Sequence, residues 1–341
     1  MGEVFDGLES STSAEAHTIE TNAPIEPTIA PTTLSPTIAP TKAKNSTSES
    51  VTLSRWPSLS RNIADSKNRL IVLIASCPYL DLVDNLVQSL LALELHNYVV
   101  VPLDESARSY AIELLGADHV VAVPPFAPSL PALKQAKFNS PAFAKITSVR
   151  PQVLHAFLDQ GFTIFYNDVD VVWRKNIFEV FDPAGENTET SDAVDMVAMV
   201  DSHPVEEAFI CSCYLYLKPT SPMKNFLLHW QSLMDGAAKK EKKKRYKNDQ
   251  EAIYDAYQDI TKPKNGKESS LKATLYPSDN EFFPSGAVYD IWPGEKQSNA
   301  YLVHNNFIRG HNFKINRFLR WNLWKPSSKM EEMDLTCNGK A

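Results

Sequence analysis

Several signature motifs are missing from this chain of 341 residues. It has no GxxxxGK[ST] loop and no GxGxxG, so neither a P-loop nor a Rossmann dinucleotide site is indicated. It also has no GxSxG elbow, which would mark one class of hydrolases. No apolar run reaches the roughly 18 residues that suggest a transmembrane helix.

An excess of positive charge is missing too. The net charge is -7, so the composition gives no reason to expect nucleic-acid binding. The one basic run is KKEKKKRYK at residues 239–247. We interpret it as a solvated loop or helix end, and the alternative is a patch for an anionic partner or a membrane surface.

Cysteine is scarce, and no CxxC pair occurs, so a zinc site is not expected. The four residues are Cys77, Cys211, Cys213 and Cys337. Cys211 and Cys213 alternate on a predicted strand, so they should face the same side. We expect buried free thiols, with a disulfide between two distant cysteines as the alternative in a lumenal or secreted protein. No histidine stands at a signature spacing from CSC, so cysteine catalysis is not indicated.

Residues 1–60 are rich in Ser, Thr and Pro, and PTIAPT occurs twice there. So few apolar side chains cannot offset the entropy of ordering, and we expect a disordered stem or linker that resembles an O-glycosylated stalk. The acidic start, MGEVFD, has no apolar segment and does not read as a signal peptide. A membrane anchor is absent from this chain, so we expect a protein that is soluble where it is made or a chain that has lost its anchor.

From Arg69 onward, apolar runs alternate with helical patterns. RLIVLIAS at 69–76 suits a strand that is buried on both faces. The alternation continues to FTIFYND at 162–168, and it predicts a mostly parallel α/β sheet with its ligand crevice at the carboxyl ends of the strands. Between these strands we expect further strands at 98–104 and 119–125 and helices at 82–95, 107–117 and 143–161.

The second half of the chain is more mixed. We expect strands at 195–201 and 208–219, helices at 222–237 and 248–260, and short strands or loops at 271–277, 281–290 and 300–308. No internal repeat of domain size is present, so one domain at residues 69–330 is predicted.

Two carboxylates, Asp168 and Asp170, follow the apolar strand in NDVD. Ionised carboxylates are costly to bury unless they are paired or bind a cation, so they either cap a turn or hold a positive group. In an extended backbone, residues two apart face the same side and can share one Mg²⁺ or Mn²⁺ ion. Such an ion bridges diphosphate oxygens and neutralises the charge of a leaving group.

His304 also follows an apolar strand, in YLVHNNFIRGHNFK. A lone histidine is more often structural, but Gly310 and Lys314 follow at a spacing that permits a phosphate-binding loop. Histidine would supply a third metal ligand, glycine a close backbone approach, and lysine a point charge for phosphate. His311 is the rival ligand, although no strand precedes it.

Asp249 and Gln250 in NDQ have a structural interpretation, because Asn248 or Asp249 would cap the helix that follows. The functional alternative is that they face a sugar or an acceptor. FPSG at residues 283–286 reads as a turn.

Five segments in order carry a resemblance: FAKITSVRPQVLHAFLDQGFTIFYNDVDVVWRKNIFEVF, FICSCYLYLKPT, KNDQEAIYDAY, FFPSGAVYD and YLVHNNFIRGHNFKINRFLRWNLW. They resemble the nucleotide-diphospho-sugar transferases of glycosyltransferase family 77, which includes plant-type xylosyl-, arabinosyl- and galactosyltransferases. The resemblance extends from about residue 69 to residue 324 and implies a GT-A fold, a Golgi or other secretory location, and roles such as the synthesis of cell wall polysaccharide.

The resemblance also implies a retaining transferase that uses a UDP-sugar donor and Mn²⁺ or Mg²⁺. It assigns the metal to Asp168, Asp170 and His304, and the donor sugar or acceptor to Asp249 and Gln250. Expected donor contacts are Ala75, Ser76, Lys145, Arg150, Asp168, Gly310 and Lys314. Lys145 has the alternative role of a structural ion-pair partner.

Two departures from the family pattern stand out. Cys213 replaces a glycine of the family, and its bulk would reshape the donor-sugar or acceptor pocket. The membrane anchor that is usual in the family is also missing. We expect transfer to a glycan or glycoprotein hydroxyl. The alternatives are a non-catalytic nucleotide-sugar or glycan-binding protein and another DxD metal enzyme that acts on nucleotides.

Overall fold

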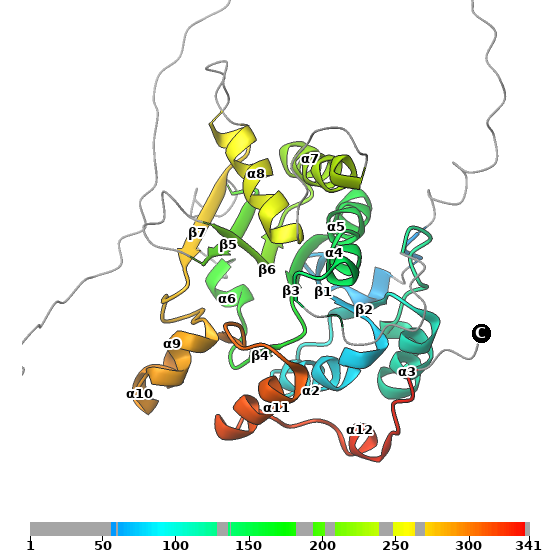
Figure 1. Ribbon diagram of the computed structural model, residues 1–341, viewed down its shortest axis with the longest axis vertical. Helices are drawn as coiled ribbons and strands as arrows, with labels where there is room; N and C mark the ends of the chain where they lie inside the picture. Colours follow the sequence, from blue (N-terminus) through cyan, green and yellow to red (C-terminus); the bar gives the residue numbers. More distant parts are fainter. Residues whose placement is uncertain are drawn as a thin grey trace, which may run out of the picture. The chain divides into compact units, whose positions relative to one another are not determined.

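The computed structural model describes the chain in stretches, which are coloured in Figure 1. They comprise residues 56–58, 61–127, 136, 138–181, 194–201, 209–238, 248–262 and 270–337. The predicted stem at 1–60 lies almost entirely outside these residues, and the basic run at 239–247 lies entirely outside them.

A six-stranded sheet in the order β2-β1-β3-β6-β5-β7 lies at the centre of the described chain. Its strands are β1 (Arg69–Ala75), β2 (Tyr98–Pro102), β3 (Thr163–Asn167), β5 (Met196–Val200), β6 (Ile210–Leu217) and β7 (Ala273–Pro277). β2, β1 and β3 are parallel neighbours, β7 is parallel to β5, and β6 is antiparallel to β3 and β5. The predicted mostly parallel α/β sheet is confirmed, with β6 as its antiparallel strand.

The apolar run of β1 supplies both faces of this sheet. Leu70 and Val72 belong to one hydrophobic core, whereas Ile71 and Leu73 belong to the other, and all four are fully buried. Successive side chains of a strand point to opposite faces, so a strand covered on both sides must be apolar at every position.

Helices cover both faces of the sheet (Figure 1). They are α2 (Leu80–Leu91), α3 (Glu105–Leu115), α4 (Pro141–Thr147), α5 (Arg150–Asp159), α6 (Phe178–Phe181), α7 (Ser221–Ala238), α8 (Asp249–Thr261), α9 (Gly286–Ile291), α10 (Gly294–Asn299), α11 (His311–Arg320) and α12 (Ser328–Glu332). α5, α7 and α8 pack in series on the side of β3 and β6, whereas α2 and α3 pack beside β1 and β2. None of the helices in the described stretches is long and apolar enough to cross a bilayer.

A second, two-stranded sheet joins the end of β3 to the C-terminal part of the chain. It consists of β4 (Val171–Trp173) and β8 (Leu302–His304), which are antiparallel. Val171 pairs with His304, and the Asn305 N–H donates to the Asp170 carbonyl at 2.9 Å. This pairing fixes the backbone of His304 beside the segment that follows β3.

Two local predictions differ from the structure. The strand expected at 119–125 makes only an isolated bridge, between Val100 and Val120, because its two prolines have no N–H to donate to a ladder. The segment at 281–290, expected to be a strand or loop, contains α9. The Ser285 hydroxyl accepts a hydrogen bond from the Val288 N–H at 3.4 Å, which caps this helix.

All four cysteines are paired, so the expectation of free thiols is wrong. Cys77 and Cys337 form a disulfide across 260 sequence positions, with Cα atoms 5.6 Å apart. Cys211 and Cys213 form the other, with Cα atoms 5.1 Å apart. The predicted alternation on one strand was correct, because both residues belong to β6 and face the same side.

The backbone around Gly286 leaves no room for a side chain. A Cβ atom there would lie 2.8 Å from the carbonyl oxygen of Asn306 and 2.9 Å from that of His304. These are backbone atoms, so they cannot rotate away. We therefore expect Gly286→Ala to lower the free energy of unfolding by about 1–3 kcal/mol, measured by urea denaturation.

Gly294 provides a matched control for this substitution. It is also the first residue of a six-residue helix, and a Cβ atom there would meet nothing within 4 Å. Gly294→Ala should be neutral or should stabilise the protein by less than about 1 kcal/mol. Equal losses in the two variants would contradict the steric explanation.

Candidate active site

Asp168 directly follows β3, and Asp170 lies in a bend at residues 169–170 that leads to β4. The extended backbone expected for these residues is therefore wrong. Nevertheless, ligand atoms of Asp168, Asp170 and His304 all lie within 4.8 Å of one another. The bend, together with the pairing of β4 and β8, brings these three side chains together.

Arg150, the first residue of α5, is a buried cation that joins several parts of the site. Its Nη2 donates to Asp168 Oδ1 at 2.9 Å, and its Nη1 donates to Asp249 Oδ2. Nη1 also donates to the hydroxyl of Ser212 at 2.8 Å and to its carbonyl at 3.2 Å. Burial lowers the pKa of Arg150, but the carboxylates, above all Asp249, outweigh burial and raise it. The guanidinium therefore stays charged.

Asp168 is oriented by more than this ion pair. The Tyr166 hydroxyl donates to Asp168 Oδ1 at 2.6 Å, and the Asp168 N–H donates to the Cys213 carbonyl at 2.6 Å. Burial raises the pKa of Tyr166 well above its usual value, so the phenol remains a donor at neutral pH. The Asp168 side chain is still 30% exposed, which leaves it accessible to a ligand.

Asp170 is the buried member of the pair. Lys314 Nζ donates to Asp170 Oδ2, and His304 Nε2 lies 3.6 Å from Asp170 Oδ1. Burial alone would raise the pKa of Asp170, but Lys314 and then His304 hold it well below its ordinary value. The carboxylate is thus ionised at neutral pH.

The chain between His304 and Lys314 turns at Gly310, where φ is +100°. This left-handed conformation favours glycine, and a Cβ atom would lie 3.0 Å from the Phe313 ring. Gly310 precedes the first residue of α11, and α11 brings Lys314 back to the loop. There the Asn305 side-chain amide donates to the Lys314 carbonyl at 2.8 Å.

The rival ligand His311 has another partner. Its Nε2 lies 2.6 Å from Asp81 Oδ2, on α2. The structure therefore groups His304, and not His311, with the two aspartates that follow β3.

Asp249 and Gln250 begin α8, but the cap of this helix is Asn248, whose Oδ1 accepts from the Glu251 N–H at 3.0 Å. Asp249 is buried, and burial raises its pKa even though Arg150 opposes that effect. Asn248 thus caps the helix, whereas Asp249 lies in the candidate site.

Asp201 is a site residue that sequence reasoning missed. It follows β5, which ends at the same edge as β3 because both strands are antiparallel to β6. Gln250 Nε2 donates to Asp201 Oδ2 at 2.7 Å, whereas the buried Oδ1 has no hydrogen-bond partner within the described stretches. Burial raises the pKa of Asp201, and Gln250 opposes this. The available signal was an acidic residue directly after an apolar strand, as in NDVD.

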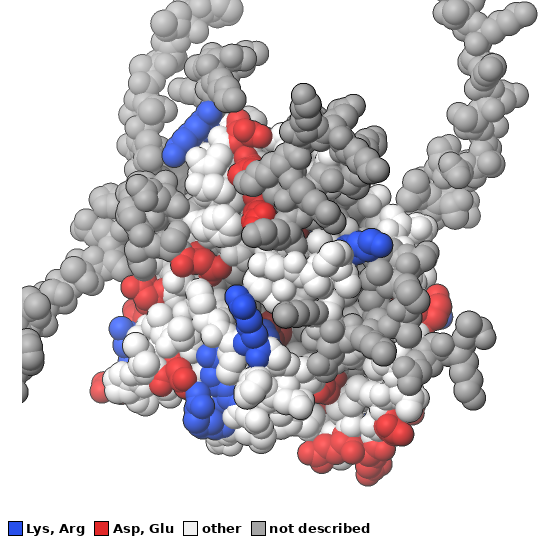
Figure 2. Space-filling view, in the orientation of Figure 1, with Lys and Arg blue, Asp and Glu red and all other residues white. Residues whose placement is uncertain are grey.

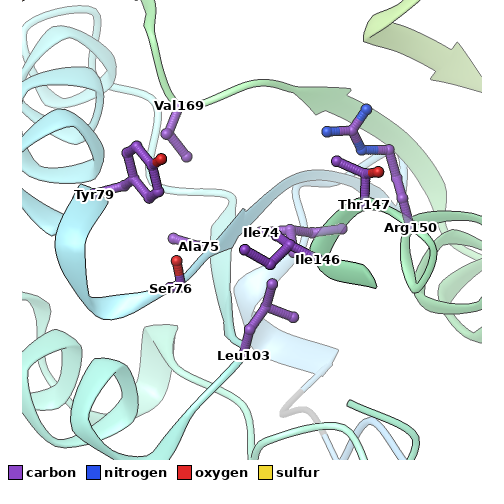
Figure 3. A pocket seen from close by; sticks show the side chains of 9 residues that line it. All are labelled: Ile74, Ala75, Ser76, Tyr79, Leu103, Ile146, Thr147, Arg150 and Val169. Carbon is purple, nitrogen blue, oxygen red and sulfur yellow. The ribbon is translucent and has the colours of Figure 1, made fainter. Parts of the chain in front are cut away.

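A cavity lies beside Arg150, at the carboxyl ends of β1 and β2. Its lining consists of Ile74, Ala75, Ser76, Tyr79, Leu103, Ile146, Thr147, Arg150 and Val169. Figure 3 shows Tyr79 and Val169 on one side and Thr147 and Arg150 on the other, with Ala75 and Ser76 on the side of Tyr79. Lys145 is exposed on α4 and does not line this cavity.

Cationic side chains gather over α11 on the face shown in Figure 2, and acidic ones gather over α12. Two of the cations of α11 have other partners. Arg317 donates to Asn305 Oδ1 at 2.7 Å, and Arg320 pairs with Asp290 at 2.6 Å. Lys314 is the cation of this helix that contacts a carboxylate following β3.

Asp168, Asp170 and His304 fit a divalent metal ion. Arg150 uses only Oδ1 of Asp168, and Lys314 uses only Oδ2 of Asp170. This leaves Oδ2 of Asp168, Oδ1 of Asp170 and the imidazole of His304 as donors. Carboxylate oxygens suit Mg²⁺ and Mn²⁺.

Comparisons with known proteins found a matching family model, curated relatives and solved structures. A family model described as nucleotide-diphospho-sugar transferase matches residues 93–318. UDP-D-xylose:L-fucose alpha-1,3-D-xylosyltransferase 1 of Arabidopsis thaliana is 28% identical over 269 residues, or 76% of this chain and 71% of that protein. Beta-arabinofuranosyltransferase RAY1 of the same plant is 25% identical over 288 residues, or 79% of this chain and 50% of that protein. The solved structure of mouse xyloside xylosyltransferase 1 has 15% identity and a TM-score of 0.40, and the match covers 70% of this chain and 98% of that one.

Removing the buried cation should strongly destabilise the protein. Arg150→Met leaves Asp249 and Asp168 without their shared partner, and we expect the free energy of unfolding to fall by about 3–5 kcal/mol. Arg320→Met is the control, because the side chain of Arg320 is 61% exposed in its pair with Asp290. It should cost less than about 1 kcal/mol. Urea denaturation of both variants measures the difference, and similar losses would argue against the role of Arg150.

Asp201→Asn should gain stability relative to the wild type as the pH rises. The pKa of Asp201 is raised from 3.8 in the folded protein, so the stability that this carboxyl contributes is present below 3.8 and is lost as the pH rises through the raised value. The asparagine side chain does not titrate. Melting temperatures from about pH 4 to pH 7 should therefore shift in favour of the variant.

Asp290→Asn is the control of opposite sign. Slight burial acts to raise the pKa of Asp290, but hydrogen bonds from Arg320 and Trp321 lower it overall. The stability that Asp290 contributes is therefore present above the unfolded pKa and is lost as the pH falls. The melting temperature of Asp290→Asn should fall relative to that of the wild type as the pH rises. The same trend in both variants would contradict the directions of the pKa shifts of Asp201 and Asp290.

Proposed function

The chain belongs to the nucleotide-diphospho-sugar transferase family, and from this premise we propose that it is a metal-dependent, retaining glycosyltransferase. It would move a sugar from a UDP-sugar to a hydroxyl group of a glycan or glycoprotein. The observation that carries the proposal is the convergence of Asp168, Asp170 and His304, with Lys314 beside them.

The nucleoside would bind in the cavity that Ala75 and Ser76 line. The lining is largely apolar, and the aromatic ring of Tyr79 stands at one end. Val169 also lines the cavity, and its neighbours in the chain are Asp168 and Asp170. A nucleoside bound there would extend its diphosphate toward these two aspartates.

Mn²⁺, or Mg²⁺ in its place, would be held by Asp168, Asp170 and His304. Such an ion supplies positive charge that binds the diphosphate and stabilises the leaving group. Lys314 would add a point charge for the same phosphates, because its ammonium group already lies against Asp170. Gly310 would allow the backbone to approach them closely.

The donor sugar would lie between the metal ligands and the start of α8. Asp249 is engaged by Arg150, so its role would be to orient that guanidinium and the first turn of the helix. Gln250 and Asp201 would bind sugar hydroxyls, because Oδ1 of Asp201 has no partner in the described part of the chain. The acceptor hydroxyl would attack from the face that the nucleotide leaves, which retains the anomeric configuration.

Residues 69–330 would form the catalytic domain and residues 1–60 its stem. A Golgi or other secretory location agrees with the two disulfides, which persist in oxidising compartments. The Arabidopsis relative named above takes xylose from UDP-xylose and adds it to fucose. A cell wall polysaccharide or glycoprotein acceptor and a UDP-xylose donor are therefore the first to test.

A panel of UDP-sugars with Mn²⁺, read out as release of UDP, tests the proposal. The wild type should release UDP from at least one donor above the protein-free background. EDTA should abolish this release, and added Mn²⁺ should restore it. Asp170→Asn should lose at least roughly a hundredfold in rate, while its circular dichroism remains that of a folded protein.

Asp259→Asn is the matched control. This aspartate also pairs with a histidine, His229, at 3.1 Å, but it is 57% exposed and lies near the other end of α8. It should keep the wild-type rate. Binding of UDP-sugars without release of UDP would point to a non-catalytic binding protein, and turnover of nucleotides that carry no sugar would indicate another DxD metal enzyme.

A further inference from the structure

A second group of potential metal ligands shares His304 with the two aspartates. Ligand atoms of Cys211, Cys213 and His304 all lie within 4.8 Å of one another, and all three residues are buried. Both cysteines come from β6, whereas His304 comes from β8. Two sulfurs and an imidazole thus converge next to the oxygen ligands Asp168 and Asp170.

The disulfide between Cys211 and Cys213 decides whether these sulfurs can bind a metal. Thiolate is the form of cysteine that binds metals, so the oxidised pair is a poor ligand. Reduction would free two sulfurs that still lie on one face of β6. Ligands of one Zn²⁺ ion at about 2.3 Å from it are at most about 4.6 Å apart, so small side-chain rotations suffice.

We propose that Cys211 and Cys213, when reduced, form with His304 a site for a soft divalent cation such as Zn²⁺, and that their disulfide closes this site. Thiolate and imidazole ligands favour Zn²⁺, whereas carboxylates favour Mn²⁺ and Mg²⁺. The redox state of the Cys211–Cys213 bond therefore determines which class of metal ion His304 can bind.

The surroundings of His304 agree with a shared ligand. Its Nε2 pairs with Asp170 Oδ1 over 3.6 Å, which is longer than an ordinary hydrogen bond. Its Nδ1 is buried and has no hydrogen-bond partner among the residues that the structure describes. Neither ring nitrogen is thus held by a short hydrogen bond there. The imidazole already lies within reach of both sets of ligands.

The surroundings of the cysteines also connect the two sets. The Cys213 carbonyl accepts from the Asp168 N–H at 2.6 Å, and the Cys211 sulfur lies 4.0 Å from Gln250 Oε1. Ser212, between the cysteines, is bound by Arg150. A cation on the two sulfurs would therefore lie beside the aspartates and the proposed sugar-binding residues.

The redox step needs a dithiol reductant. Its thiolate attacks the Cys211–Cys213 bond to form a mixed disulfide, and its second thiol then closes the reductant's own disulfide. Two electrons and two protons are thereby transferred, and both cysteines end as thiols. Binding of Zn²⁺ then releases the two thiol protons to water.

Zinc on the two sulfurs would compete with the aspartates for His304. We therefore expect reduction followed by Zn²⁺ to inhibit Mn²⁺-dependent transfer, a consequence that rests on the proposed function. The site itself does not depend on that function, because it can be measured without any donor or acceptor.

Cobalt titration tests the site directly. The protein is reduced with dithiothreitol, freed of it by gel filtration, and titrated with Co²⁺ as a spectroscopic probe of the zinc site. Reduced wild type should show thiolate-to-cobalt charge-transfer absorption that saturates at one equivalent and that Zn²⁺ removes, and the oxidised protein should show no such absorption. Cys211→Ser, Cys213→Ser and His304→Ala should each lose at least roughly a hundredfold in Zn²⁺ affinity.

The other disulfide gives the control. A variant with both Cys77→Ser and Cys337→Ser should keep the charge-transfer absorption. In the wild type, which needs no substitution, Zn²⁺ should slow the alkylation of reduced Cys211 and Cys213 relative to the zinc-free protein, as read by peptide mass spectrometry. The rates at Cys77 and Cys337 should be the same with and without Zn²⁺. Absence of the absorption in reduced wild type, its persistence in His304→Ala, or an equal effect of Zn²⁺ on the alkylation of all four cysteines would overturn the proposal. Failure of transfer in the UDP-sugar panel would not affect this result.

Discussion

The neutralisation of carboxylates at one edge of the sheet is the constraint on which the rest of the structure depends. Asp168, Asp170, Asp201 and Asp249 gather there, and an unpaired buried carboxylate costs several kcal/mol. Arg150 pairs with Asp168 and Asp249, and Lys314 pairs with Asp170. Asp201 has a neutral partner, the side chain of Gln250. Because α5 carries Arg150, it must lie close to the end of β3 and the start of α8. Because α11 carries Lys314, it must return to the loop after β8.

The same constraint prepares the site for its ligands. The cations orient Asp168 and Asp170, and Lys314 holds the pKa of Asp170 well below its ordinary value, but one oxygen of each carboxylate stays open. A ligand set that is already charged and positioned needs little reorganisation when a metal ion and a diphosphate arrive. His304 belongs to both groups of potential ligands, these oxygens and the sulfurs of Cys211 and Cys213. The redox state of the sulfurs therefore affects the same metal site.

Much of this could be predicted from the sequence. The mostly parallel α/β sheet followed from the alternation of apolar runs and helices. The family resemblance is confirmed by the match at 93–318. The gathering of Asp168, Asp170 and His304 followed from strands that end in polar residues. The bend at 169–170, the site position of Asp201 and the bond between Cys211 and Cys213 could not be predicted. The bend and the position of Asp201 depend on how β6 and β8 pair with segments far away in the chain, which local patterns do not encode. The sequence places Cys211 and Cys213 on one side of a strand but does not show whether they are oxidised.

Anomalous scattering from manganese in crystals grown with Mn²⁺ and UDP tests the central claim most directly. The account predicts one peak within bonding distance of Asp168, Asp170 and His304, with UDP in the cavity beside Ala75 and Ser76. Well-defined UDP without manganese at these three side chains, or with manganese bound elsewhere on the protein, would contradict it.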